Sequence, residues 1–563
     1  MTRVPVRRHV PVGSLVAWTA MCFFMALGSA SAAISLGNVS PTWASTTGGP
    51  VIFFAVGQTS APFTATIGGI PVAVIAQPSG AASPYVLVAP PHPPGPADFV
   101  VTNSVDHTTA SVTITYVDLP VTGFASPVVA VSTRSDGTEG TARGVGSGAL
   151  GGAASGDGRY VAFFTETDLG FGASTNLGFG AYVKDLQTGA LSPLTDDTPN
   201  SCVNFCGALS ISLDGLTVAH ITDLPGGSGR YVVATRAPFP GSPQRVDVND
   251  QGQSAPGDAG IAALSGSGRF VVFTTTANLD ADVGDVATTA DLFVRDLAGG
   301  HTERWTTNVA VTSASITADG RYIAFTTTAS LVPDDTNGVS DVYVIDRSSA
   351  SPAAPAYRLI TLGANGASTG ARISADGSTL AFTSGASTLG VVDTNGVADV
   401  YWASLPDGAI RKVLFQGAEN VAAASAASVS GNGRWIALAT AARPPVADAL
   451  PAVLGTPTQP YVFDRFTGET FPLNANAAGE IGDYLFAVGT SLSPDGRRAL
   501  LLSLATNLLT TPDTNALFDD FSKEMPLDTR VGTSVLTNRS TSRRAEARPW
   551  SPSPPSARPA RRR

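Results

Sequence analysis

Short apolar segments alternate with polar, glycine-containing turns through most of this chain. The clearest unit is SITADGRYIAFTTT at residues 315–328, where one apolar strand runs into Ala318-Asp319-Gly320 and a second leaves as Arg321–Thr327. Apolar runs of this length, joined through Asp-Gly, are typical of β-hairpins. Glycine supplies the positive φ angle that such a turn requires. The pattern therefore predicts a hairpin and a structural role for the Asp-Gly pair.

This hairpin recurs along the chain with a spacing of about 56 residues, a period that indicates a propeller or a solenoid. Its turn glycines are Gly158, Gly215, Gly268, Gly320, Gly377, Gly433 and Gly496. In the fourth copy two more strands are expected at 341–346 and 357–361, so each repeat should form a four-stranded meander. The second and third strands are apolar on both faces, which predicts sheets covered on both sides by their neighbours.

The string S-x-D-G-R-Y-x-A-F followed by D-V-Y-V-x-D resembles the WD-like propeller repeat of the TolB family, over residues 128–523. The resemblance implies an all-β propeller. Seven copies indicate seven blades, with six as the alternative because propellers of this family commonly have six. We expect Val128–Thr133 to complete the last blade, whose own third strand degenerates at 518–521. The alternative closing strand is Val531–Thr537.

Residues 34–118 differ from the repeats in their sequence pattern, which predicts six or seven short strands separated by Gly-Gly and Pro-rich turns. This pattern predicts a small β-sandwich. The positions of Pro41, Gly48-Gly49, Gly68-Gly69, Pro90-Pro91, Gly95 and Asn103 resemble the turns of the IPT/TIG immunoglobulin-like domain, although Gly57-Gln58 departs from the family's usual step. The resemblance implies a structural or protein-binding module. Residues 119–127 are expected to be a linker.

The first 33 residues have the pattern of an export signal. Three arginines precede an apolar run at 15–27, and Ala30-Ser31-Ala32 provides a small-residue cleavage site. The alternative is a membrane anchor, but the run is shorter than the ~20 residues that span a bilayer. We therefore predict an exported protein of the periplasm or cell surface, with no transmembrane segment after signal cleavage.

Charge is distributed unevenly along the chain. The whole chain carries −10, the signal segment +3 and residues 539–563 +7, which leaves −20 for residues 34–538. Such a body repels nucleic acid. From 524 onward we expect a degenerate end and then an Arg/Pro/Ser-rich disordered tail, because this composition cannot build a core. Cys202 and Cys206 are expected to close a local disulfide in an exported chain, with two free thiols as the alternative.

Three loops between the second and third strands of their repeats share the pattern D-T-N-x-x-x-D. Carboxylate and amide oxygens are the ligands that calcium prefers, so these loops are candidate calcium sites. The candidate ligands are Asp335, Asn337, Asp341, Asp393, Asn395, Asp399, Asp513, Asn515 and Asp519. The alternative is that these side chains bond to the backbone and hold the turn, because one loop supplies fewer than the six to eight oxygens that calcium takes. In a meander these loops lie on the rim opposite the Asp-Gly turns.

Signatures of catalysis are weak in this sequence. Residues 366–370 match G-x-S-x-G but lead into a strand rather than a strand-to-helix elbow, and no two of His92, His107, His220 and His301 are close in sequence. We therefore interpret the chain as an exported, monomeric, non-catalytic binding or scaffold protein whose propeller face engages a protein or glycan of the cell envelope. The alternative is a propeller-fold enzyme that acts on polysaccharide through carboxylates at the axial channel.

Overall fold

The computed structural model describes residues 35–40, 42–46, 49–56, 63–72, 74–75, 85–104, 107–117, 125–142, 149–165, 167–171, 180–194, 207–223, 229–279, 289–390, 393–405, 408–415, 417–419, 422–441, 458–483, 487–510 and 518–525. These residues form strands and turns and no helix. The predicted signal segment, Cys202, Cys206 and the Arg/Pro/Ser-rich tail lie outside the described residues. The all-β prediction is confirmed for the residues that are described.

The N-terminal unit consists of two sheets that share one core. The first sheet has the order β1 (Ser35–Ser40), β3 (Gly49–Val56), β7 (Tyr85–Ala89) and β6 (Val74–Ile75). The second has the order β2 (Trp43–Ser45), β9 (Thr109–Val117), β8 (Gly95–Asn103), β4 (Phe63–Ile67) and β5 (Ile70–Val72). Phe53 and Phe99 come from different sheets and meet edge to face, with ring centroids 5.2 Å apart. Such buried aromatic contacts hold the two sheets together.

Between residues 128 and 525 the described strands include seven four-stranded antiparallel meanders. The first three are β12 (Ala149–Ala154), β13 (Tyr160–Thr165), β15 (Gly180–Asp185) and β16 (Leu191–Pro193); β17 (Gly207–Ile211), β18 (Thr217–Asp223), β19 (Arg230–Arg236) and β20 (Gln244–Arg245); and β21 (Ala259–Leu264), β22 (Phe270–Thr275), β23 (Asp291–Asp296) and β24 (His301–Arg304). The next two are β25 (Val311–Ile316), β26 (Tyr322–Thr327), β27 (Asp341–Asp346) and β28 (Tyr357–Leu359); and β29 (Ser368–Ile373), β30 (Thr379–Ser384), β31 (Asp399–Ser404) and β32 (Ile410–Lys412). The last two are β33 (Ala424–Val429), β34 (Trp435–Thr440), β35 (Gln459–Asp464) and β36 (Thr470–Pro472); and β37 (Ala487–Leu492), β38 (Arg498–Ser503), β39 (Asp519–Glu524) and β10 (Val128–Ala130). A separate two-stranded ribbon pairs β11 (Thr141–Ala142) with β14 (Thr167–Asp168).

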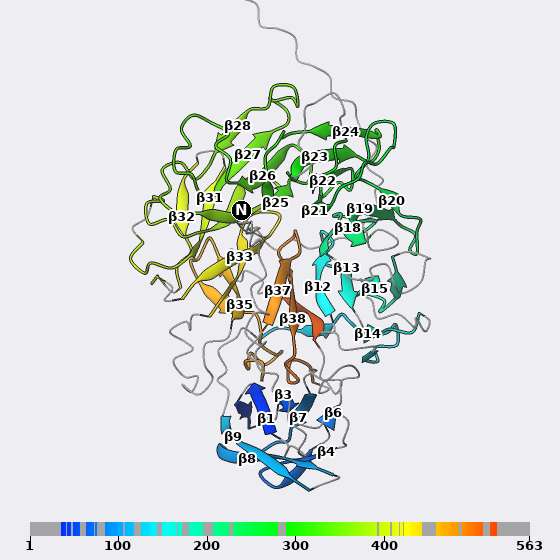
Figure 1. Ribbon diagram of the computed structural model, residues 1–563, viewed down its shortest axis with the longest axis vertical. Helices are drawn as coiled ribbons and strands as arrows, with labels where there is room; N and C mark the ends of the chain where they lie inside the picture. The colour runs from blue at the N-terminus through cyan, green and yellow to red at the C-terminus, as the bar shows by residue number, and fades with distance from the viewer. Residues whose placement is uncertain are drawn as a thin grey trace, which may run out of the picture. The chain divides into compact units, whose positions relative to one another are not determined.

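The meanders stand around a common axis as in a β-propeller (Figure 1). The first strand of each sheet packs against the first strand of the next, and β37 of the last sheet packs against β12 of the first. The chain therefore closes into a ring, which leaves no sheet face at an open end.

The strand that completes the last sheet comes from the beginning of the repeat region, as predicted. Val129 of β10 pairs with Ser522 of β39 in an antiparallel register. The expectation that the third strand of this sheet degenerates at 518–521 is wrong, because β39 is a regular strand of six residues. Its polar residues obscured the strand pattern in the sequence.

The third strand of the fourth sheet, β27, explains why the strands of these sheets are apolar on both faces. Val342 and Val344 pack into a core shared with the fifth sheet, which includes Phe382. Tyr343 and Ile345 point the other way, into a core shared with the third sheet. Alternate residues of one strand thus serve two interfaces. Burying each large side chain stabilises the fold by about 1.5–3 kcal/mol.

The Asp-Gly turn is held by its own side chains. Asp319 Oδ1 accepts hydrogen bonds from the Thr317 hydroxyl at 2.6 Å and from the Arg321 amide at 2.9 Å. Gly320 adopts a φ of 77°, in the left-handed region that favours glycine. The same bond from a hydroxyl two residues earlier recurs at Asp157, Asp214, Asp376, Asn432 and Asp495. The structural role that the pattern predicts for these residues agrees with this geometry.

The turns are also joined to one another around the axis. Each turn donates a backbone amide to a carbonyl of the next turn, and the last donates to the first, at N···O distances of 2.7–2.9 Å. The seven bonds run from Gly156 to Leu213, Leu213 to Gly266, Ser267 to Ala318, Ala318 to Ala375, Asp376 to Gly431, Gly431 to Pro494 and Asp495 to Gly156. We call this closed set of backbone bonds the turn ring.

The turn glycines also allow close approach between sheets. A Cβ atom at Gly320 would lie 2.3 Å from Cδ2 of Phe270, which belongs to the preceding sheet. Gly215 meets Tyr160 in the same way, at 2.4 Å. The glycine is therefore required both for the turn conformation and for the aromatic residue that packs against it.

We predict that Gly320→Ala destabilises the protein by about 2–5 kcal/mol, because it combines a strained φ with a clash that neighbouring atoms must relieve. Gly338 is the matched control, since its φ is 68° and no atom lies within 4 Å of its Cβ position. Gly338→Ala should cost only about 1–2 kcal/mol, from backbone strain alone. Urea unfolding of both variants measures the difference in the free energy of unfolding. Equal losses would show that the clash with Phe270 does not contribute to the destabilisation.

Candidate functional site

The rim that carries the Asp-Gly turns is lined by paired charges. Arg321 follows the turn glycine and donates to both carboxylate oxygens of Asp346, at 2.9 and 2.7 Å. The guanidinium also lies 4.6 Å from the ring centroid of Tyr322. Hydrogen bonds from Arg321 hold the pKa of Asp346 well below its usual range, against a smaller opposing effect of burial. The same pairing occurs in Arg159–Asp185, Arg269–Asp296 and Arg434–Asp464.

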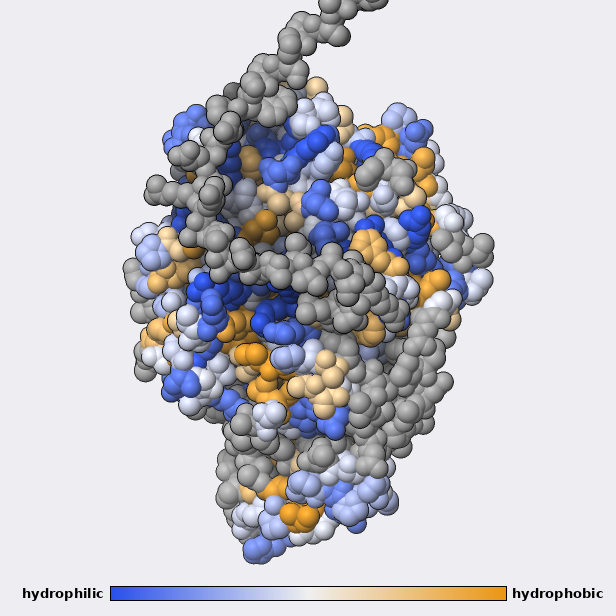
Figure 2. Space-filling model, turned by 180° about the vertical axis from the view of Figure 1, so that it is seen from behind, coloured by the Kyte–Doolittle hydropathy of each residue, from blue (hydrophilic) through white to orange (hydrophobic). Residues whose placement is uncertain are grey.

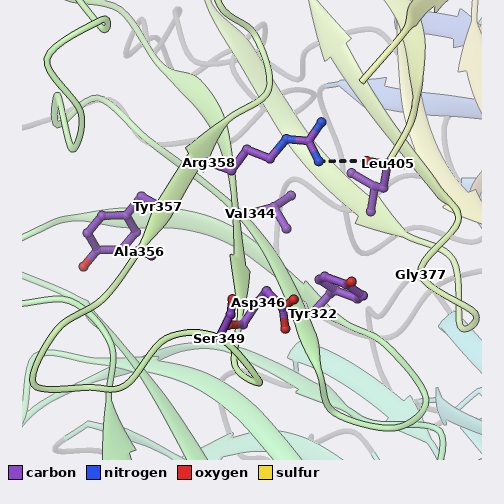
Figure 3. A pocket seen from close by; sticks show the side chains of 9 residues that line it. All are labelled: Tyr322, Val344, Asp346, Ser349, Ala356, Tyr357, Arg358, Gly377 and Leu405. Carbon is purple, nitrogen blue, oxygen red and sulfur yellow. Dashed lines mark hydrogen bonds between the residues drawn. The ribbon is translucent and has the colours of Figure 1, made fainter. Parts of the chain in front are cut away.

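A pocket of about 430 Å³ opens on this rim between the fourth and fifth sheets. Figure 3 shows Tyr357 and Arg358 extending to opposite sides of β28, while Tyr322 and Asp346 lie together at another part of the wall. The complete lining is Tyr322, Val344, Asp346, Ser349, Ala356, Tyr357, Arg358, Gly377 and Leu405. The pocket combines aromatic surface with an acidic and a basic group.

The polar groups of the pocket are already engaged with neighbouring atoms. Arg358 donates through Nη1 to the Leu405 carbonyl at 2.7 Å, which bridges the two sheets. The Tyr357 side chain points away from the pocket toward the third sheet (Figure 3), where its hydroxyl donates to the Trp305 carbonyl at 2.6 Å and burial raises its pKa to about 12. The pKa of Asp346 in the pocket wall lies far from neutral pH, whereas a general base or acid works best with a pKa near the working pH. The arrangement suits binding of a ligand by preset groups.

Over the described part of the face in Figure 2, hydrophilic and hydrophobic residues are interspersed. The sequence did not predict this pocket, because its lining comes from three strands and three turns that are separated in the chain. The only signal in the sequence was the aromatic residue after Asp-Gly-Arg in this repeat, Tyr322.

The first acidic loop, between β26 and β27, buries two of its three predicted calcium ligands. Asp335 and Asp341 are 6% and 0% exposed, whereas Asn337 is exposed and donates to the Ala364 carbonyl at 3.1 Å. Burial raises the pKa of Asp341, against the opposing effects of the Thr361 hydroxyl and the Asn337 amide. The two aspartates thus lie where a charge is costly without a partner.

The second acidic loop, between β30 and β31, already holds a cation from the protein. The Lys412 ammonium lies 3.1 Å from Asp393 Oδ1, 2.7 Å from Asp399 Oδ2 and 2.8 Å from Glu419 Oε1. Asn395 donates to Asp399 at 2.8 Å. The calcium prediction therefore loses its support at this loop, because Lys412 supplies the positive charge there.

The third acidic loop is only partly described. Asp513 and Asn515 lie outside the described residues. Asp519 begins β39 and accepts a hydrogen bond from the Ser132 hydroxyl at 2.5 Å. Within the described ranges, no three His, Cys, Asp or Glu side chains form a cluster that could hold a metal ion.

The other candidates for chemistry do not assemble into a catalytic site. Ser368 of the G-x-S-x-G match begins β29, is buried, and donates its hydroxyl to Ser384 at 2.9 Å. His220 is buried in β18, His301 contacts Asp250 at 2.6 Å, and His92 stacks on Tyr116. These three histidines therefore contact different neighbouring residues and do not lie together in one site. In the part of the chain that the structure describes, no helix has the length and hydropathy of a membrane span.

Comparisons with known proteins concern solved structures. No protein-family model and no curated protein matches this sequence. The chain is similar to a putative TolB from Agrobacterium tumefaciens at 17% identity and a TM-score of 0.31, over 46% of this chain and 79% of the other. It is also similar to an oligogalacturonate lyase in complex with manganese, at 14% identity and a TM-score of 0.42, over 72% and 98%. The β-propeller domain of the Trilobed protease from Pyrococcus furiosus gives 9% identity and a TM-score of 0.40, over 67% and 92%. These similarities are too low to transfer a function.

We predict that His220 makes stability depend on pH. The ring is 1% exposed and meets Phe164 edge to face, and burial lowers its pKa to about 4. An unfolded histidine binds a proton near pH 6.5, so stability is fully present above that pH and falls as the pH drops toward 4. The loss should approach about 3 kcal/mol.

His220→Leu should flatten this part of the profile of melting temperature against pH between 7 and 4.5. His107→Asn is the control, because His107 is exposed and has a φ of 58°, which asparagine tolerates. Its profile should follow that of the unmodified protein. Parallel profiles for all three proteins would contradict the assignment to His220.

Proposed function

We propose that this chain is an exported, non-catalytic binding protein composed of an immunoglobulin-type unit and a seven-bladed propeller. The seven meanders and their closure through β10 support the blade number. Two sheets around a shared core, together with the IPT/TIG-like turn positions, support the immunoglobulin-type unit. The partner is a protein or glycan of the cell envelope, bound by a monomer.

The pocket between the fourth and fifth sheets carries this proposal. The ring of Tyr322 offers apolar contact to a sugar ring or an aliphatic side chain, and Asp346 and Arg358 offer fixed polar groups at the edges of the pocket (Figure 3). Because Arg321 and the Leu405 carbonyl hold these groups in place, little side-chain entropy is lost when a partner binds. A preset recess of this kind is typical of recognition sites.

The predicted export signal and the charge of the chain support a role in the envelope. The signal-like segment at 1–33 supports export, and a body charge of −20 favours cationic or neutral partners over nucleic acid. The acidic side chains of the Asp-Gly turns accept hydrogen bonds that hold those turns. These bonds favour a structural role for the turn carboxylates over the alternative of polysaccharide cleavage at the axis.

We predict that filling the pocket weakens partner binding. Ala356 lines the pocket and is exposed, so Ala356→Trp places an indole in the recess without removing a hydrogen bond. Loss of a central contact costs about 1–3 kcal/mol in binding, which corresponds to a 5- to 150-fold weaker affinity. Capture from cell-envelope extract, quantified for proteins and for glycans, measures the effect.

Ala353→Trp provides the matched control, because Ala353 is exposed in the same connection but does not line the pocket. It should capture the same partner as the unmodified chain. If Ala356→Trp and Ala353→Trp capture the same amount of partner, the pocket is not the binding site. Release of sugar fragments from envelope polysaccharide would instead favour the enzymatic alternative.

A further inference from the structure

The fourth and fifth sheets have acidic loops of similar sequence, but only in the fifth sheet does a lysine contact the loop carboxylates. In the fifth sheet, Lys412 contacts Asp393 Oδ1 and Asp399 Oδ2, and its side chain is 1% exposed. The lysine reaches them from the outermost strand, where it lies across from Tyr401 of β31. One ammonium therefore neutralises both loop carboxylates from a defined position of the sheet.

The equivalent position in the fourth sheet holds no charge. There Leu359 lies across from Tyr343, in the register that Lys412 occupies across from Tyr401. The third sheet has Arg304 at this position, across from Phe293, and its guanidinium contacts Asp291 at 2.6 Å. The fourth sheet keeps the acids of its neighbours but has leucine where they have a cation.

The carboxylate oxygens without a partner in the fourth sheet correspond to the oxygens of Asp393 and Asp399 that contact Lys412 in the fifth sheet. Asp335 Oδ1 and Asp341 Oδ2 are buried and accept no hydrogen bond, although the nearby Asn337 amide, which donates to the Ala364 carbonyl, lowers the pKa of Asp341. Their other oxygens are engaged, since Asp335 Oδ2 accepts from the Tyr343 hydroxyl and Asp341 Oδ1 accepts from Thr361 at 2.5 Å. The Ser340 hydroxyl is also buried without a partner, and the fifth sheet has Ala398 at this place. Three buried oxygens without a hydrogen-bond partner thus lie within the seven residues 335–341, whose counterpart in the fifth sheet contacts a lysine.

We propose that the loop between β26 and β27 binds one calcium ion through Asp335 Oδ1, Asp341 Oδ2 and Ser340 Oγ. Two carboxylates balance the charge of a divalent ion, and the three protein ligands are all hard oxygens. Backbone carbonyls and water complete the six to eight oxygens that calcium takes. The ion takes the electrostatic role that Lys412 has in the neighbouring sheet, so the loop beside Lys412 binds none.

The decisive variant restores the cation of the neighbouring sheets. In Leu359→Lys, an ammonium at this register position should neutralise Asp335 and Asp341 and exclude calcium. Asp341→Asn should also abolish binding, by removing one ligand charge. Asp334→Asn is the control, since Asp334 is exposed beside the loop and carries the same charge change. The full chain is freed of metal with chelator, and calcium chloride alone is added back.

Equilibrium dialysis should find one calcium ion per chain for the unmodified protein and for Asp334→Asn, and none for Leu359→Lys or Asp341→Asn. Calcium at a hundredfold excess over Kd should raise the melting temperature by about 3 °C in the first two proteins only. Without calcium, Leu359→Lys should melt above the unmodified protein. If the lysine variant does not fold by circular dichroism, Asp341→Asn carries the test.

Three results would overturn the proposal. The first is absence of calcium binding by the unmodified chain. The second is calcium binding that persists in both Leu359→Lys and Asp341→Asn, which would place the ion elsewhere. The third is an equal rise in melting temperature with potassium chloride, which would show that the loop does not select a divalent ion.

Discussion

The turn ring is the constraint on which the rest of this architecture depends. Sheets in a propeller contact only their neighbours, so a defect between any two of them opens the whole circle. Here each contact includes a backbone hydrogen bond between adjacent turns, and the bond from Asp495 to Gly156 joins the last turn to the first. At some of these positions the approach leaves no room for a side chain, since a Cβ atom at Gly156 or Gly431 would lie 2.8 or 2.6 Å from the carbonyl oxygen of the neighbouring turn. Other positions of the ring accept larger residues, as Leu213 and Pro494 show.

Local pattern predicts local structure well in this chain. The third strand of the fourth sheet was expected at 341–346 and is found there, because its apolar run is bounded by charged residues that end the strand. Closure by residues near 128 was also predictable, since an unpaired strand at one end must complete the sheet at the other. The Asp-rich β39 shows the limit, because burial inside the ring overrides the low β-propensity of its first two residues.

The pocket and the charge pairs could not be predicted from the sequence, because they depend on the register between strands that are distant in the chain. The acidic loops at 335–341 and 393–399 share D-T-N-G-V-x-D, so the loops themselves do not distinguish a site from a turn. The difference lies on the fourth strand, where one sheet has Leu359 and the other Lys412. That signal becomes readable only when the repeats are aligned by strand register rather than by their most similar strings.

Buried acids at the start of third strands impose a common electrostatic requirement on these sheets. Removing one member of a buried ion pair typically costs 3–5 kcal/mol, because the remaining charge is left without a partner. Arg304 meets this requirement for Asp291, and Lys412 meets it for Asp399. In the fourth sheet the requirement is met either by a proton, toward which burial shifts Asp341, or by an ion from solution. A bound ion satisfies both aspartates and the Ser340 hydroxyl at once, whereas one proton satisfies a single carboxylate.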